Sequence, residues 1–146
     1  MTTAQSGFLT MNRPEVRNAL STELFEALYT ALGAAEADES VRAVVLTGTD
    51  PAFCAGVDLK QAQSLGMDYF GRFDKKMNCM NAIVELSKPV VGGAINGATF
   101  TGGLEIALAC DFLIASERAV FFADTHARVG ILPGGGMTAR LPPRLV

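Results

Sequence analysis

Apolar residues in the first third of the chain alternate between strand-like runs and a helix-like spacing. The apolar run at residues 7–11 and the β-branched run at residues 41–46 (VRAVVL) each predict a strand. Between them Ser21 is a good helix N-cap, and the apolar positions that follow recur every three or four residues to about residue 38: Leu24, Phe25, Leu28, Leu32 and Ala35. Helix followed by strand, in an order that recurs later, predicts an α/β fold with crossover units and parallel pairing.

The middle and end of the chain continue this pattern less regularly. Residues 49–58 are predicted to be a loop at the carboxyl end of a strand, where open α/β sheets bind ligands, and residues 61–64 to be irregular or helical. Strands or extended segments are predicted at residues 90–95, 112–115 and 119–122. One amphipathic helix is predicted over residues 67–86. Its apolar stripe is interpreted as core packing, with an acyl-chain wall as the alternative, and consists of Phe70, Phe73, Met77, Met80 and Val84.

Residues 90–111 (VVGGAINGATFTGGLEIALACD) combine a strand, a glycine turn and a helix predicted over residues 104–110. Gly102 and Gly103 leave the amides of the first helical turn open to a ligand, and Glu105 lies in that turn. One interpretation is a site for an oxygen that gains negative charge, with an acid/base beside it. The other is a tight turn in which Glu105 only complements the helix dipole. The turn alone leaves both open.

The composition is that of one packed domain, with 146 residues of which 49% are hydrophobic and 18% charged. A formal net charge of -3 offers no basic surface for nucleic acid. The apolar runs are too short to span a bilayer and the N-terminus lacks a signal-peptide pattern, so a cytoplasmic protein is expected. Cys54, Cys79 and Cys110 are odd in number and widely spaced, which favours reduced thiols. The single histidine, His126, rules out a multi-His metal site within one chain, and no metal is expected.

Several motifs of other enzyme classes are absent from the glycine-rich segments. Residues 97–103 lack the Lys-Ser/Thr of a Walker loop, residues 92–97 do not match GxGxxG, and no GxSxG occurs. These absences disfavour nucleotide hydrolysis, dinucleotide redox chemistry and serine hydrolysis.

Four stretches, in order along nearly the whole chain, together resemble the enoyl-CoA hydratase/isomerase (crotonase) family. They are residues 12–21 (NRPEVRNALS), 41–60 (VRAVVLTGTDPAFCAGVDLK), 88–111 (KPVVGGAINGATFTGGLEIALACD) and 122–136 (FADTHARVGILPGGG). The resemblance implies an α/β, crotonase-like spiral of β-β-α units that binds an acyl-CoA thioester. Complete members carry a further C-terminal helical region that caps the acyl pocket and builds a trimer, often paired into a hexamer. Residues 1–146 are therefore expected to be an incomplete single domain, truncated at both ends and lacking that region.

The resemblance also implies roles for particular residues. The backbone N–H groups of Val57 and Gly102 would form an oxyanion hole for the thioester oxygen, and Glu105 falls on the first of the two catalytic carboxylates of the hydratases. Coenzyme A would be part of the substrate and no separate cofactor is expected. The segment that lies along the coenzyme A in the family matches Ala55, Asp58, Leu59 and Lys60.

The chain departs from the family pattern at the second catalytic carboxylate, where His126 stands. An imidazole can act as acid or base near neutral pH, so His126 is a candidate second acid/base, with Asp124 as a substitute. Thr101 stands where the family usually has Ala or Gly, and a β-branched residue there is stiff and would crowd the acyl pocket.

The function expected from the resemblance is the reversible hydration of 2-enoyl-CoA through a thioester enolate. Double-bond isomerisation or another reaction of the family is the first alternative. A non-catalytic acyl-CoA-binding or assembly subunit is the second, favoured by His126 and by the short chain. Without the helices that cover the core, apolar surface would be exposed, so a homo-oligomer is expected.

Overall fold

Two small parallel sheets form the centre of the fold in the computed structural model, which describes residues 5–66, 68–69, 78–117, 119 and 122–142. The first sheet has the order β1 (Gln5–Met11), β2 (Val41–Gly48), β4 (Val90–Ala94). The second has the order β3 (Ala52–Cys54), β5 (Ala98–Phe100), β6 (Phe122–Ala123). The predicted strands at residues 7–11, 41–46 and 90–95 and their parallel pairing are confirmed.

Two turns of the chain each contribute one strand to each sheet and then a helix. β2 and β3 precede α2 (Leu59–Leu65), and β4 and β5 precede α5 (Gly102–Ala109). In a third turn Ala115 pairs with Ile95 beside the first sheet, β6 joins the second, and the 3-10 helix η2 (His126–Val129) follows. This is the spiral of β-β-α units that the resemblance implies. β3 and β5 are neighbours in the second sheet. The connections that follow their carboxyl ends consequently lead to neighbouring helix starts, those of α2 and α5.

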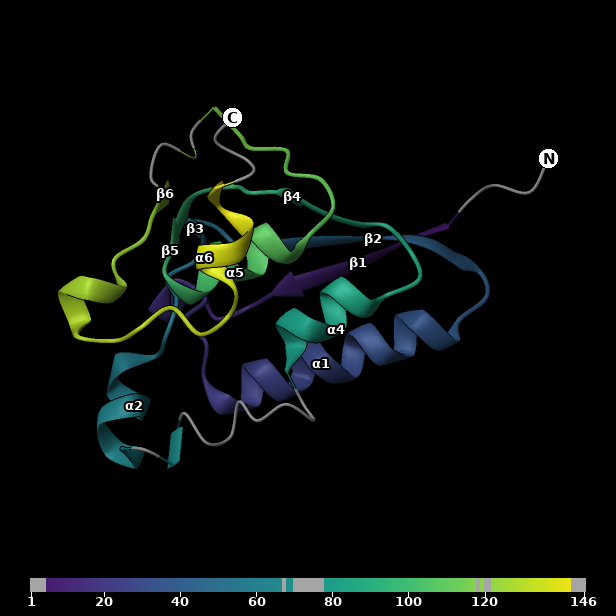
Figure 1. Cartoon of the computed structure of the whole chain (residues 1–146). Helices are drawn as coiled ribbons and strands as arrows, with labels where there is room; N and C mark the ends of the chain where they lie inside the picture. The colour runs from purple at the N-terminus through teal and green to yellow at the C-terminus, as the bar shows by residue number, and fades with distance from the viewer. Residues whose placement is uncertain (1–4, 67, 70–77, 118, 120–121, 143–146) are drawn as a thin grey trace.

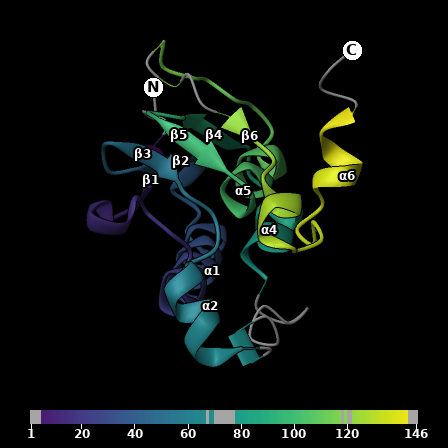
Figure 2. The same cartoon turned by 90° about the vertical axis from the view of Figure 1, so that its left-hand side faces the viewer.

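Helices cover one face of the first sheet, where α1 (Thr22–Ala37) and α4 (Cys79–Glu85) lie side by side (Figure 1). In the view turned by 90°, the strands of both sheets lie together and α1 and α2 extend away from them (Figure 2). The side chain of Ser21 accepts the Leu24 amide at 3.2 Å and caps α1, as predicted. The core between helices and sheet includes Phe25, Leu28, Leu32, Val44, Leu46 and Val90.

Three predictions of local structure need correction. Residues 49–58 are not only a loop, because Ala52–Cys54 pairs with β5 as strand β3. Residues 112–115 are not a buried strand, since Phe112 and Ile114 are 61% and 63% exposed and a single bridge at Ala115 joins the segment to Ile95. The residues of this segment are apolar, but among the described residues no strand covers the outer side of the segment.

The single helix predicted over residues 67–86 is also wrong at Asn78. Asn78 has extended backbone angles (φ -87°, ψ 106°), and its side chain accepts the amides of Met80 and Asn81, so a new helix, α4, begins there. Residues 67 and 70–77 of the prediction lie outside the described residues. Short elements complete the fold: η1 (Pro14–Val16) and α6 (Met137–Arg140). All three cysteines are buried and free, as expected.

Asn18 links the N-terminal segment to the connection between the two sheets. Its side chain is fully buried, and its backbone has a φ of 55°. Nδ2 donates to the carbonyls of Thr49 (2.8 Å) and Ala52 (2.7 Å), while Oδ1 accepts the Arg13 amide (2.8 Å). Three backbone groups from two segments therefore depend on one amide side chain for their hydrogen bonds.

Replacing Asn18 by glycine tests this link without straining the backbone, because glycine tolerates a positive φ. Asn18→Gly is expected to lower the free energy of unfolding by about 3 kcal/mol, since it leaves buried backbone groups unpaired. Urea denaturation measures the change, and Asn81→Ala, at an exposed position of α4, should stay within about 0.5 kcal/mol of wild type. Equal stabilities for the two variants would contradict the assigned role of Asn18.

Candidate active site

Four of the residues singled out in the sequence border one cavity of about 270 Å3: Val57, Gly102, Glu105 and His126. Val57 lies in the β3–α2 connection, Gly102 and Glu105 in the first turns of α5, and His126 at the start of η2. The remaining wall is mostly apolar, with Leu20, Phe25, Met80, Ile131 and Leu132. The cavity thus joins two backbone amides, a carboxyl group and an imidazole in largely apolar surroundings.

The backbone of Val57 is fixed by a parallel bridge to Leu20. The Leu20 amide donates to the Gly56 carbonyl (2.7 Å), and the Asp58 amide donates to the Leu20 carbonyl (3.2 Å). In a parallel bridge the residue between these two bonds directs its own N–H and C=O away from the partner strand. The amide of Val57 makes no hydrogen bond to any described residue, and Val57 borders the cavity.

Tyr69 also stabilises the bridge between Leu20 and Val57. Its hydroxyl donates to the Leu20 carbonyl and accepts the Asp58 amide at 3.3 Å. Burial raises the pKa of the phenol to about 12, so the hydroxyl stays a donor near neutral pH. Tyr69 also borders the cavity. No motif in the sequence marks this residue, and its contribution emerges only from the packing.

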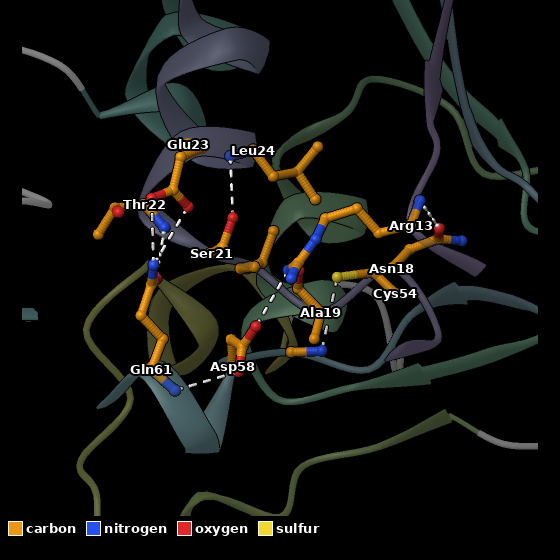
Figure 3. Close-up of polar contacts among 12 residues, drawn as sticks. Arg13, Asn18, Ala19, Ser21, Thr22, Glu23, Leu24, Cys54, Asp58 and Gln61 are labelled. Atoms are coloured by element: carbon orange, nitrogen blue, oxygen red, sulfur yellow. Dashed lines mark hydrogen bonds and ion pairs between the residues drawn. The ribbon is translucent and has the colours of Figure 1, made fainter. Parts of the chain in front are cut away.

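A network of polar contacts holds the loop that carries Val57 against the N-terminus of α1 (Figure 3). Arg13 donates through Nη1 to the Ala19 carbonyl (2.6 Å) and to the Asp58 carboxylate (3.0 Å). The second oxygen of Asp58 accepts the Gln61 amide at 3.2 Å and caps α2. Asp58, which the resemblance assigns to coenzyme A binding, is therefore engaged in positioning the loop.

The second amide belongs to Gly102, the first residue of α5. The amides of a helix's first turn lack intrahelical partners, and Gly102 makes no hydrogen bond from its N–H to a described residue. Thr101 precedes it in a strained conformation for a β-branched residue (φ 44°, ψ -117°). Its hydroxyl packs against Gly56, where an added Cβ would lie 1.8 Å from Thr101 Oγ1. The two loops therefore approach each other as closely as backbone allows.

The carboxyl group of Glu105 is buried and has only one oxygen free for chemistry. Oε1 accepts the amides of Gly135 (2.7 Å) and Met137 (3.2 Å), which come from the glycine run and the start of α6. Oε2 faces Nε2 of His126 at 3.6 Å. The space is tight, because a Cβ added at Gly135 would lie 2.6 Å from Oε2. This glycine run, residues 134–136, ends the last of the four stretches that resemble the family, and nothing in the sequence indicated that it binds the carboxylate.

His126 is buried and lies between two carboxyl groups. On the side away from Glu105, its Nδ1 is 2.6 Å from Oδ1 of Asp124, and the same oxygen accepts the His126 backbone amide at 3.1 Å. These hydrogen bonds, from the backbone first and the ring second, lower the pKa of Asp124, so its carboxylate is the acceptor. Asp124 faces the histidine ring, and it is absent from the wall of the cavity.

The other residues assigned to coenzyme A lie beside this site. Ala55 and Leu59 border a smaller cavity of about 60 Å3, whose wall also includes Val57, Thr101 and His126. Lys60 is exposed in the first turn of α2. Thr101 therefore faces the smaller cavity rather than the larger one. Among the described residues, no group of three or more His, Cys, Asp or Glu side chains is arranged to hold a metal ion.

Fold and site together define a class of α/β protein in which two residues with unpaired backbone amides, a buried carboxyl group and an imidazole border one largely apolar cavity. Such donors stabilise an oxygen that gains negative charge, and the pair can move a proton next to it. The chain belongs to the enoyl-CoA hydratase/isomerase family, whose model matches residues 3–145.

Named relatives agree with this membership. A probable peroxisomal enoyl-CoA hydratase of Arabidopsis thaliana is 42% identical over 134 residues, covering 91% of this chain and 49% of the relative. Among solved structures, an enoyl-CoA hydratase from Mycobacterium tuberculosis H37Rv is 50% identical with a TM-score of 0.80, covering 98% of this chain and 58% of that chain. One from Bacillus anthracis is 36% identical with a TM-score of 0.87, covering 98% and 55%. The chain spans about half the length of the curated relatives it matches. No helix in the described part is long and apolar enough to cross a membrane.

A pair of glycine variants tests the close approach of the two loops. Gly56 and Gly66 both have a positive φ, 87° and 57°, but a Cβ at Gly66 would meet nothing within 4 Å. Gly66→Ala is expected to cost about 1–3 kcal/mol through backbone strain. Gly56→Ala adds the clash with Thr101 and should lower the free energy of unfolding by at least about 2 kcal/mol more. If denaturant melts show the same loss for both, the contact with Thr101 does not constrain the fold.

Proposed function

We propose that this chain acts on acyl-CoA thioesters by holding an enolate oxygen between the amides of Val57 and Gly102, and that its reaction is the reversible hydration of 2-enoyl-CoA. The observation that supports the proposal is that Val57 and Gly102, whose amides have no partner among the described residues, border the same cavity as Glu105 and His126. A thioester carbonyl gains charge as the enolate forms, so fixed donors help most in the transition state.

The proposed proton path uses the free faces of both side chains. As water adds to Cβ of the enoyl group, Oε2 of Glu105 takes a proton from it, and the π electrons move onto the thioester oxygen. The enolate then collapses as protonated His126 delivers a proton from Nε2 to Cα. Afterwards the proton on Glu105 passes to His126, whose Nε2 lies 3.6 Å from Oε2, and the starting state returns. Atoms balance as enoyl-CoA plus water giving 3-hydroxyacyl-CoA.

The site needs no cofactor for this chemistry, because coenzyme A is part of the substrate. The ammonium of Lys60 is exposed near the cavities and suits a phosphate of coenzyme A, while Ala55 and Leu59 offer apolar surface. A homo-oligomer, trimer or hexamer, would cover apolar side chains such as Phe112 and Ile114, which are more than half exposed. The proposed location is the cytoplasm.

Binding of acetoacetyl-CoA tests the two amides directly. An oxyanion hole favours the enolate of this ligand, whose ultraviolet absorbance is expected to rise to saturation on titration. Gly102→Pro removes the N–H at the first helical position, where proline is tolerated, and should weaken this binding by about 10²-fold or more. Gly102→Ala keeps the amide, with its Cβ 3.1 Å from the end of the Leu20 side chain, and should keep most of the affinity.

The absence of a rise with folded wild-type protein would contradict the proposed oxyanion hole and favour a non-catalytic subunit. An equal rise for all three proteins would show that the enolate binds elsewhere.

Glu105→Gln tests the acid/base. The amide can still accept the Gly135 and Met137 N–H groups through its oxygen, so the fold is expected to survive. Hydration of crotonyl-CoA, followed by loss of absorbance of the conjugated thioester, should fall by about 10²–10⁴-fold. Glu85→Gln, at an exposed position of α4, should keep wild-type activity.

Hydration by Glu105→Gln at the wild-type rate would remove Glu105 from the mechanism. Enolate binding by the wild type without any hydration would redirect the proposal to isomerisation, tested with a 3-enoyl-CoA.

A further inference from the structure

Three side chains form a line from the surface into the cavity: Asp124, His126 and Glu105. Oδ1 of Asp124 is 2.6 Å from Nδ1 of the ring, and Nε2 of the ring is 3.6 Å from Oε2 of Glu105. The histidine side chain is 5% exposed and that of Glu105 4%, whereas Asp124 is 37% exposed. Asp124 is thus the outer member of the line and His126 the one between two carboxyl groups.

The geometry fixes the ring in one orientation. Oδ1 of Asp124 accepts two hydrogen bonds, from the His126 backbone amide and from Nδ1, so the carboxylate cannot rotate away without losing the backbone bond. A carboxylate accepts but does not donate, and the proton of the neutral ring therefore stays on Nδ1. Nε2 is left as the atom that faces Glu105 and the cavity.

We propose that Asp124 is a positioning residue of this site, which keeps His126 in the Nδ1–H form and stabilises its protonated form, so that Nε2 can exchange protons on the cavity side. The proposal rests on the proposed function for its catalytic consequence, while the effect on the ring stands by itself. Asp124 itself touches no substrate in this scheme, because it lies outside the cavity wall.

Other ionisable groups near the ring are few. The cavities that His126 borders contain, among the described residues, two further titratable side chains, Glu105 and Tyr69. Arg140 donates to the Gly135 carbonyl and does not border either cavity. The protonation of His126 is therefore expected to respond chiefly to Asp124 on one side and Glu105 on the other. Solvent screens Asp124 in part, which keeps the expected effects moderate.

Nuclear magnetic resonance of the ring tests the proposal without relying on activity. His126 is the single histidine of the chain, so its imidazole signals need no assignment. In the wild type, ¹⁵N shifts above the titration midpoint should show the Nδ1–H form. Asp124→Asn keeps an acceptor for both N–H groups but loses the charge, so the protonated ring should become less favoured and the midpoint should move to lower pH. Glu117→Gln, an exposed carboxylate in the preceding segment, should leave it unchanged.

Kinetics then ask whether Asp124 acts through the ring. Asp124→Asn should lower kcat for crotonyl-CoA hydration by about ten-fold and move the limb of the pH profile that follows His126 to lower pH, as in the titration. His126→Gln should lower kcat by about 10²-fold. In the His126→Gln background, Asp124→Asn should change kcat by less than about two-fold, because residues that act as a unit are not additive.

Two results would overturn the proposal: an Nε2–H ring in the wild type, or a titration midpoint that ignores Asp124→Asn. A loss of kcat of the same size with and without His126 would also overturn it, since Asp124 would then act on the structure alone. If the wild type hydrates no enoyl-CoA, the proposed function fails, and the ¹⁵N and titration results still decide how Asp124 controls the ring.

Discussion

The structure depends on the close approach of two connections, β3–α2 and β5–α5, which bring the amides of Val57 and Gly102 to one cavity. Their backbones meet at Gly56, where the hydroxyl of Thr101 occupies the space that any side chain would need. A second contact lies beside it, because a Cβ at Gly103 would lie 2.4 Å from the Cys54 carbonyl. The spacing between the two amides is therefore set by backbone packing rather than by flexible side chains, which is the preorganisation that the proposed oxyanion hole would require.

Burial of Glu105 imposes a second constraint. A carboxylate in apolar surroundings costs several kcal/mol unless its oxygens find donors. The amides of Gly135 and Met137 supply them, and the Gly135 carbonyl is in turn bound by Arg140. The glycine run has no side chains that would separate these amides from the carboxylate. Consequently the segment from η2 to α6 completes the site as well as the fold, because it supplies both His126 and the donors that fix Glu105.

The sequence was sufficient to predict those parts of the fold whose local pattern agrees with their environment. Strong periodicity and a Ser21 cap made α1 predictable, an apolar run made β1 predictable, and a β-branched run made β2 predictable. Short strands such as Ala52–Cys54 were not predicted, because three residues are too few to show a hydrophobic periodicity. Their pairing partner, β5, also lies more than forty positions away in the sequence. The prediction of a buried strand at residues 112–115 was wrong, because the apolar character of Phe112 and Ile114 does not reveal that the segment lies at the surface.

The candidate site, like the fold, could be predicted only in part from the sequence. Motifs of the family pointed to Val57, Gly102 and Glu105, all of which the structure places at one cavity. The parts that could not be predicted are contacts between segments: the Tyr69 hydroxyl on Leu20 and Asp58, and the Gly135 amide on Glu105. Each joins groups whose partner is fixed by packing, and no spacing in the sequence encodes it.

An imidazole opposite Glu105 changes the electrostatics of the site. Two carboxyl groups facing each other at this distance would repel when both are ionised, so one of them would have to keep a proton. An imidazole can instead carry the opposite charge, and the pair attracts. A ring has two nitrogens, however, and only one of them can face the cavity. The ring can therefore act there only if the proton of its neutral form is held on the other nitrogen. Asp124 holds that proton on Nδ1 through a single oxygen, Oδ1, which accepts hydrogen bonds from both the ring and the backbone amide of His126. Replacing a carboxylate by histidine in such a site thus calls for a second acidic residue behind the ring, and in this chain it stands two positions away.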